Sequence, residues 1–203
     1  MMKLIGMLDS PFVRRAAITL KLKGISFEHQ SLSVFRNFDE FQSINPLVKA
    51  PTLIGDEGWQ MVDSSMIIDW AESVGSGASL MPSEPAARLR TLQLLGLALT
   101  ACEKSVQIVY EGKRAESHRD QDWLTRIKDQ LTAAYAALER EASGRNSWLV
   151  GDTLTQADIT VAVAWGFTQL MQPELIQAAD HPALAVLSAR AEQLPEFAAL
   201  PPT

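Results

Sequence analysis

A serine followed by a proline, Ser10-Pro11, stands between a short apolar run and a stretch of helical character. Serine is a preferred N-cap and proline suits the first helical position, so the pair predicts a helix that begins at about Pro11. Backbone N–H groups and the helix dipole at such an end favour an anion, for example a thiolate. Lowering the pKa of a thiol from about 8.5 to about 6.5 requires roughly 2.7 kcal/mol, and one hydrogen bond to a charged acceptor contributes about 1.5–3 kcal/mol. Ser10 is therefore either a helix cap alone or also the donor that holds a thiolate.

A second motif contains two prolines five residues apart, in Asn45-Pro46-Leu47-Val48-Lys49-Ala50-Pro51. Pro51 cannot donate a hydrogen bond to a sheet, so it marks the start of a strand or a tight bend. A cis Ala50–Pro51 bond would turn the N–H and C=O of Ala50 away from the sheet. A peptide-like ligand could pair with these groups as an added strand. The alternative is an ordinary loop that enters a strand.

Two further motifs stand at expected helix starts. Asp63-Ser64 can cap a helix. The same groups can bind a ligand instead, the Ser64 hydroxyl and nearby N–H groups a carboxylate, and Asp63 an ammonium group. Leu154-Thr155-Gln156-Ala157-Asp158 is a variant of the capping box and predicts a helix that starts near Thr155. This last motif has a structural role only.

The elements that must position these motifs differ between the two parts of the chain. In the first part, short β-like runs alternate with expected helices, at residues 4–7, 11–23, 25–32, 52–54, 59–62 and 64–73. This order indicates a small α/β domain with a mixed sheet, residues 1–80. From residue 85 onward, apolar residues recur at spacings of three and four, which predicts an all-helical domain over 85–203. A segment rich in Gly, Ser and Pro, residues 75–82, joins the two.

Composition narrows the class of protein further. The net charge of −6 over 203 residues weighs against nucleic acid and anionic membranes as partners. The single cysteine, Cys102, excludes an intramolecular disulfide and a cysteine-rich zinc site, and the three histidines show no metal-ligand spacing. No apolar run approaches the roughly 20 residues of a membrane span, and the N-terminus does not read as a signal peptide. We therefore expect a soluble, cytoplasmic protein that binds no metal.

In their order and spacing, the four motifs resemble those of cytosolic glutathione S-transferases, from Lys3 to about Leu194. Ser10-Pro11-Phe12-Val13-Arg14 resembles the N-terminal motif of the bacterial, serine-type members. Asn45-Pro46 with Lys49-Ala50-Pro51 resembles the family's cis-proline segment, and Asp63-Ser64 its acid-serine motif. The resemblance implies a thioredoxin-like α/β domain that binds glutathione, followed by an all-α domain that contributes the electrophile site.

The resemblance also assigns roles to single residues. Ser10 would be the catalytic residue, hydrogen-bonding the glutathione sulfur and favouring its thiolate. The Ala50 backbone would pair with the cysteinyl part of glutathione, beside a cis Pro51. Valine is commoner than Ala50 at this position, but only the backbone is needed there.

The two ends of glutathione would be held by charged and polar side chains. Asp63 and Ser64 would bind the γ-glutamyl end, and Lys49 is placed to meet the glycyl carboxylate. Glycine is commoner than Val48 in this segment, so the loop is expected to bend differently.

The electrophile site is less evident from the sequence. Its candidate lining residues, for each of which the alternative is a core residue, are Phe12, Leu99, Cys102, Val106, Tyr110 and Trp165. Glu103 either reaches the glutathione of a partner subunit or is a solvated or interface charge. Arg14 and Arg15 are expected to make ion pairs at the domain interface.

Together these features predict a homodimeric glutathione transferase that activates glutathione as a thiolate for addition to a small hydrophobic electrophile, in detoxification. One alternative is a glutathione-dependent reductase or isomerase on the same fold. A thiol–disulfide mechanism would normally require a cysteine at position 10, so Ser10 counts against the reductase. The other alternative is a non-catalytic module that binds glutathione or another protein.

Overall fold

A computed structural model describes residues 1–202. The chain divides into two compact units. The first contains Met1–Leu80 together with the C-terminal segment from Leu194, and the second contains Met81–Gln193. The C-terminal segment therefore packs with the first unit, although it follows the helices of the second in the sequence.

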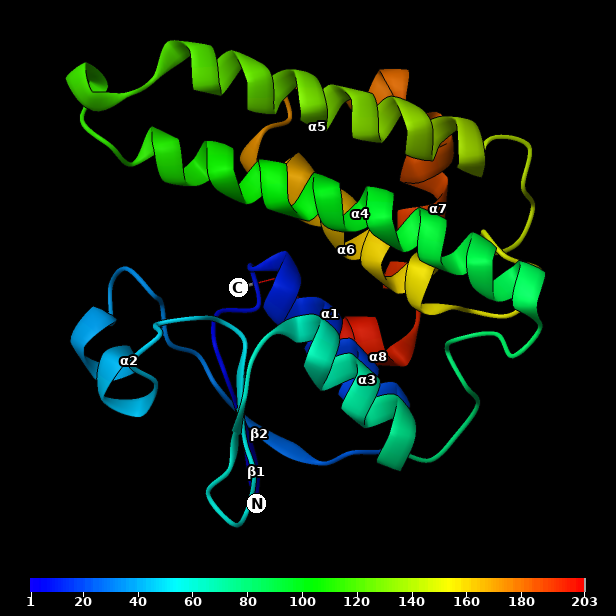
Figure 1. The fold of residues 1–203 in the computed structure, drawn as a ribbon. Helices are drawn as coiled ribbons and strands as arrows, with labels where there is room; N and C mark the ends of the chain where they lie inside the picture. Colours follow the sequence, from blue (N-terminus) through cyan, green and yellow to red (C-terminus); the bar gives the residue numbers. More distant parts are fainter. Residues whose placement is uncertain (203) are drawn as a thin grey trace. The chain divides into compact units, whose positions relative to one another are not determined.

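The first unit is built on a four-stranded mixed sheet with the order β2-β1-β3-β4. β1 (Met2–Ile5) pairs in parallel with β2 (Phe27–Gln30) and antiparallel with β3 (Thr52–Ile54), and β3 pairs antiparallel with β4 (Gln60–Met61). Helices α1 (Pro11–Leu22) and α3 (Ser64–Val74) cover one face of the sheet, and α2 (Phe38–Ile44) lies on the other (Figure 1). The short helix α8 (Pro195–Ala198) packs beside α1. The mixed sheet and its helices confirm the predicted α/β domain.

β1 contributes buried residues to both faces of the sheet, since successive strand residues point to opposite sides. Leu4 and Ile5 of β1 are neighbours in the sequence, and both are fully buried. Ile5 belongs to an apolar cluster with Leu32 and Phe41, on the side of α2. The strand ends after Ile5 because Gly6 has a φ of +138°, which residues with a side chain rarely adopt. A Cβ on Gly6 would also stand 2.6 Å from the Val13 side chain.

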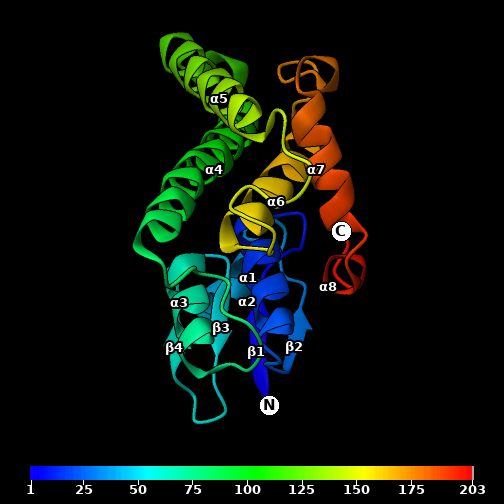
Figure 2. The same cartoon turned by 90° about the vertical axis from the view of Figure 1, so that its right-hand side faces the viewer.

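The second unit is helical. It contains α4 (Pro85–Gly112), α5 (Gln121–Ala142), α6 (Gln156–Met171) and α7 (Pro182–Glu192), with the 3-10 turns Glu116–His118 and Ala178–Asp180. α4 packs against α5 and α6, and α6 packs against α7 (Figure 2). This arrangement confirms the predicted run of helices.

The capping box at the start of α6 is present as the sequence predicts. The fully buried carboxylate of Asp158 accepts hydrogen bonds from the Leu149 N–H at 2.7 Å and the Thr155 N–H at 2.8 Å. It also accepts the Thr155 hydroxyl proton, at 2.7 Å. The same carboxylate therefore starts the helix and fixes the preceding loop against it.

The length and apolar composition of α4 differ from the expectation that no segment is apolar enough to span a membrane. Within residues 1–202, α4 is the one helix long and apolar enough to cross a bilayer. The core helix of a soluble protein can meet the same criterion, and α4 packs against two helices of its own unit. Length and composition alone therefore do not make α4 a membrane span.

Candidate active site

Ser10 is the N-cap of α1, and Pro11 occupies the first helical position. The Ser10 N–H donates to the Met7 carbonyl at 3.1 Å, and the Ser10 carbonyl accepts the Arg14 N–H at 2.9 Å. Within the described residues, the Ser10 side chain makes no capping hydrogen bond to the helix. The half-buried hydroxyl is therefore placed at the positive end of α1 without serving as its cap.

The segment from Asn45 to Thr52 is held by its own polar groups. The Ala50–Pro51 peptide bond is cis, as the resemblance implied. The buried Asn45 donates from Nδ2 to Thr52 Oγ1 at 2.8 Å, and Thr52 Oγ1 donates to the Lys49 carbonyl at 2.7 Å. These bonds fix the backbone on both sides of Ala50.

Val48 lies in the loop that we expected to bend differently, because glycine is commoner at this position in the family. It has a φ of +47°, in the left-handed region that glycine favours. Its side chain packs against the cluster of Ile5, Leu32 and Phe41. The loop thus takes a backbone conformation suited to glycine while a valine contributes apolar contact.

Asp63 and Ser64 lie at the start of α3. Asp63 is the N-cap, and its Oδ1 accepts the N–H groups of Ser65 at 2.9 Å and Met66 at 3.4 Å. Its Oδ2 is 3.9 Å from Lys49 Nζ, and both side chains are about half exposed. The acid-serine motif and the proline-containing loop therefore meet at one place in the first unit.

Ser64 has a partner that the sequence did not suggest. It is only 2% exposed, and its Oγ accepts a hydrogen bond from Arg15 Nη1 at 2.9 Å. Arg15, also 2% exposed, reaches the Ser65 Oγ from the same nitrogen, at 3.3 Å. The sequence shows an arginine at this position of the expected helix, but it does not identify the partner.

Arg14 binds the C-terminal segment. Its Nε donates to the Leu200 carbonyl at 2.8 Å, its Nη2 lies 3.5 Å from the Phe197 carbonyl, and its guanidinium lies 5.6 Å from the centre of the Phe197 ring. These contacts all lie within the first unit. The ion pairs expected for Arg14 and Arg15 at the domain interface stay a prediction.

The candidate electrophile-site residues are divided between the units. Phe12 is half-buried on α1, whereas Cys102, Val106 and Tyr110 are on α4. Cys102 is fully buried, and Tyr110 is 47% exposed, although the burial of its hydroxyl raises the pKa of that group. Their role in an electrophile site stays a prediction.

Another candidate, Trp165, belongs to the core of the second unit. Its ring is 5.7 Å from that of Tyr135 and 5.8 Å from that of His181, and it is only 5% exposed.

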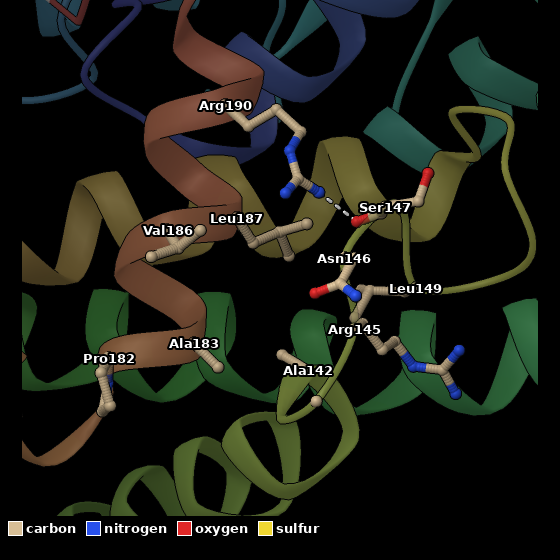
Figure 3. A pocket seen from close by; sticks show the side chains of 11 residues that line it. Ala142, Arg145, Asn146, Ser147, Leu149, Pro182, Ala183, Val186, Leu187 and Arg190 are labelled. Atoms are coloured by element: carbon tan, nitrogen blue, oxygen red, sulfur yellow. Dashed lines mark hydrogen bonds between the residues drawn. The ribbon is translucent and has the colours of Figure 1, made fainter.

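A separate pocket of about 300 Å³ lies in the second unit, between the end of α5, the loop after it and α7 (Figure 3). Arg190 closes one side by donating a hydrogen bond to the Ser147 carbonyl, and its guanidinium lies 5.6 Å from the centre of the Trp148 ring. Its lining includes Leu149 and Leu187 but none of the predicted site residues. Among residues 1–202, no group of three or more His, Cys, Asp or Glu side chains is arranged to hold a metal ion.

The mixed sheet with its cis proline, followed by a helical unit, defines a thioredoxin-like domain joined to an all-α domain. The family model described as the glutathione S-transferase N-terminal domain matches residues 4–78, and that of the C-terminal domain matches residues 121–190. The chain belongs to the glutathione S-transferase family.

Individual relatives agree with this assignment. A glutathione S-transferase from Methylobacterium radiotolerans, crystallised with glutathione sulfonate, is 32% identical with a TM-score of 0.91; the match covers 99% of this chain and 94% of that one. A family member from Pseudomonas fluorescens, with bound glutathione, is 28% identical with a TM-score of 0.83; the match covers 100% of this chain and 100% of that one. The GST-like protein YibF of Escherichia coli is 29% identical over 186 residues, 92% of this chain and 91% of YibF.

Proposed function

We propose that this chain is a glutathione transferase that binds glutathione in its first unit and holds the sulfur as a thiolate at Ser10. The observation that carries the proposal is the Ser10 hydroxyl, which lies at the N-terminal end of α1 and makes no capping hydrogen bond among the described residues. A donor in that position, next to the helix dipole, suits an anionic sulfur. The relatives crystallised with glutathione or its derivatives support this choice of ligand.

In the reaction, the glutathione thiol loses its proton to water, and the Ser10 hydroxyl donates a hydrogen bond to the thiolate that remains. The thiolate attacks an electrophilic carbon of the second substrate, so a carbon–sulfur bond forms and a leaving group or a π-electron pair departs. Ser10 stays unmodified throughout. The chain contributes electrostatic stabilisation and orientation, which together favour the nucleophilic form of the sulfur.

The rest of glutathione would be bound by the groups around Ala50 and Asp63. The Ala50 backbone pairs with the cysteinyl part. Lys49 meets the glycyl carboxylate, at little cost because its present ion pair with Asp63 is long and half exposed. Asp63 uses one oxygen to cap α3 and keeps the other for the γ-glutamyl ammonium, while Ser64 binds the neighbouring carboxylate.

A transferase fits these residues better than a reductase does. The chain has one cysteine, and Cys102 is fully buried. A reductase would need an accessible protein thiol to form a mixed disulfide with glutathione, and position 10 carries a serine. The reactive sulfur is therefore that of glutathione, and its target is a small hydrophobic electrophile.

We further propose that the protein is a cytoplasmic homodimer. Leu89 and Leu92 lie one helical turn apart on α4 and are 60% and 49% exposed, which suits contact with a second copy. Analytical ultracentrifugation of the wild type and of Leu89→Glu/Leu92→Glu tests this: a dimer that the double variant converts to monomer supports the assignment. A monomeric wild type at micromolar concentration would overturn it.

The function itself is tested by calorimetric titration with glutathione, followed by an assay of conjugation to a generic aryl halide. We expect saturable binding and turnover, and we expect both to weaken when Asp63 is changed to alanine. A wild-type protein that neither binds glutathione nor conjugates the halide would reject the transferase in favour of an interaction module.

A further inference from the structure

Arg15 is a buried cation whose contacts lead directly to the proposed glutathione site. It lies on α1, is 2% exposed, and donates from one nitrogen, Nη1, to the hydroxyl oxygens of Ser64 and Ser65. A charge removed from water in this way is costly unless its hydrogen-bonding groups are satisfied. Serine hydroxyls can satisfy the Arg15 guanidinium only as hydrogen-bond acceptors. Their protons therefore remain available for donation to a ligand.

A hydroxyl carries one donated proton and two acceptor lone pairs. Because the Ser64 oxygen accepts from Arg15, its proton is directed away from the guanidinium. The N–H of Ser64, as the first residue of α3, has no acceptor within its own helix. The start of α3 therefore offers two donors side by side, backed by a buried positive charge, and this combination suits a carboxylate.

Asp63 completes the arrangement. Its Oδ1 accepts the N–H groups of Ser65 and Met66, whereas its Oδ2 faces the more exposed side where Lys49 lies. A negative group and a set of donors with a positive charge behind them are thus adjacent in the sequence and in space. This pairing matches the ammonium and carboxylate groups that the γ-glutamyl end of glutathione carries on one carbon.

We propose that Arg15 is a positioning and specificity-determining residue for this end of glutathione, acting through Ser64. It orients the Ser64 hydroxyl as a donor, and its charge makes the subsite select an α-carboxylate. The inference rests on the proposed function. It predicts that Arg15 matters for the glutamyl carboxylate and not for the sulfur.

The test compares two ligands by calorimetry on the full-length protein: glutathione, and the analogue in which the glutamyl α-carboxylate is replaced by hydrogen. For the wild type we expect clear preference for glutathione. Arg15→Met should weaken glutathione binding about tenfold to a hundredfold, as expected for a lost charged hydrogen-bonding partner. The same variant should change binding of the analogue less than twofold. In the conjugation assay the KM for glutathione should rise while kcat stays within twofold.

The neighbouring arginine supplies a matched control. Arg14 is on the same helix and equally buried, but it binds the carbonyls of Leu200 and Phe197. Arg14→Met should lower stability without changing the preference for glutathione over the analogue. Ser64→Ala should reproduce the loss seen in Arg15→Met, and the double variant should lose less than the product of the two single effects, because both act on one contact.

The outcomes separate this inference from the proposed function. If the wild type does not bind glutathione, the proposed function fails and the inference falls with it. If the wild type binds and prefers glutathione but Arg15→Met keeps that preference, the role of Arg15 is wrong and the transferase remains. If circular dichroism shows that Arg15→Met is unfolded, Arg15→Gln is measured in its place, because glutamine retains a donor without the charge. A preference for glutathione that falls less than threefold in that variant would overturn the proposal.

Discussion

Ser10→Ala separates the two roles open to a serine at the start of a helix. Removing an N-cap hydroxyl typically costs about 0.5–2 kcal/mol of stability. Ser10 makes no capping hydrogen bond within the described residues, so we expect the free energy of unfolding to change by less than about 0.5 kcal/mol. The hydrogen bond to a bound thiolate is worth about 1.5–3 kcal/mol, so its loss should raise the pKa of bound glutathione by about one to two units.

The assay is a pH titration of the ultraviolet thiolate absorbance of bound glutathione, with the rate of aryl halide conjugation followed in parallel. Urea unfolding of the same samples gives the stability. From a pKa of about 6.5, the thiolate fraction at pH 7, and with it the conjugation rate, should fall about threefold for a rise of one unit and about 25-fold for two units.

Thr155→Ala is the matched control, since the Thr155 hydroxyl is engaged with Asp158 at 2.7 Å. It should lose about 1–2 kcal/mol of stability and leave the thiol pKa unchanged. If Ser10→Ala instead behaves like Thr155→Ala, losing stability while the pKa of bound glutathione stays where it was, Ser10 is a helix cap and the proposed catalytic role is wrong.

Three further changes test the structure. Burial raises the pKa of Asp158, although hydrogen bonds from Leu149 and Thr155 oppose the shift. The native state therefore binds the proton more tightly than the unfolded state does. In urea titrations, the stability of the wild type relative to Asp158→Asn should increase as the pH falls from 7 to 4. Val48→Gly should be more stable than Val48→Ala by about 1 kcal/mol, because alanine keeps the cost of a positive φ, and equal stabilities would contradict that backbone. Tyr135→Phe removes a buried hydrogen bond to Thr168 and should lower the thermal midpoint, at a cost of about 1 kcal/mol.

Local signals in the sequence predicted where the elements begin. Ser10-Pro11, Asp63-Ser64 and Thr155-Asp158 each stand at the start of a helix, because caps and prolines act within a few residues of the chain. The end of β1 was less predictable. The apolar run 4–7 suggested a strand there, whereas β1 is Met2–Ile5, because the backbone of Gly6 leaves the extended region.

Contacts between distant residues were beyond the sequence. Arg15 and Ser64 are 49 positions apart, and Arg14 and Leu200 are 186 positions apart. The sequence predicted α1 and shows two adjacent arginines in it, but it does not identify the acceptors of these arginines. The same limit applies to the C-terminal segment, whose place in the first unit depends on the Arg14 contacts and on packing of α8.

The three capped helices show why a motif alone does not assign a role. At α6, Thr155 and Asp158 direct their polar groups to each other and to the backbone, and both are almost fully buried. At α3, Asp63 caps the helix with one oxygen and remains half exposed. At α1, the Ser10 side chain makes no capping hydrogen bond within the described residues, although its sequence is as typical of a cap as the others. The motif is the same kind of helix start in all three cases, and only the contacts seen in the structure show which polar groups are already engaged.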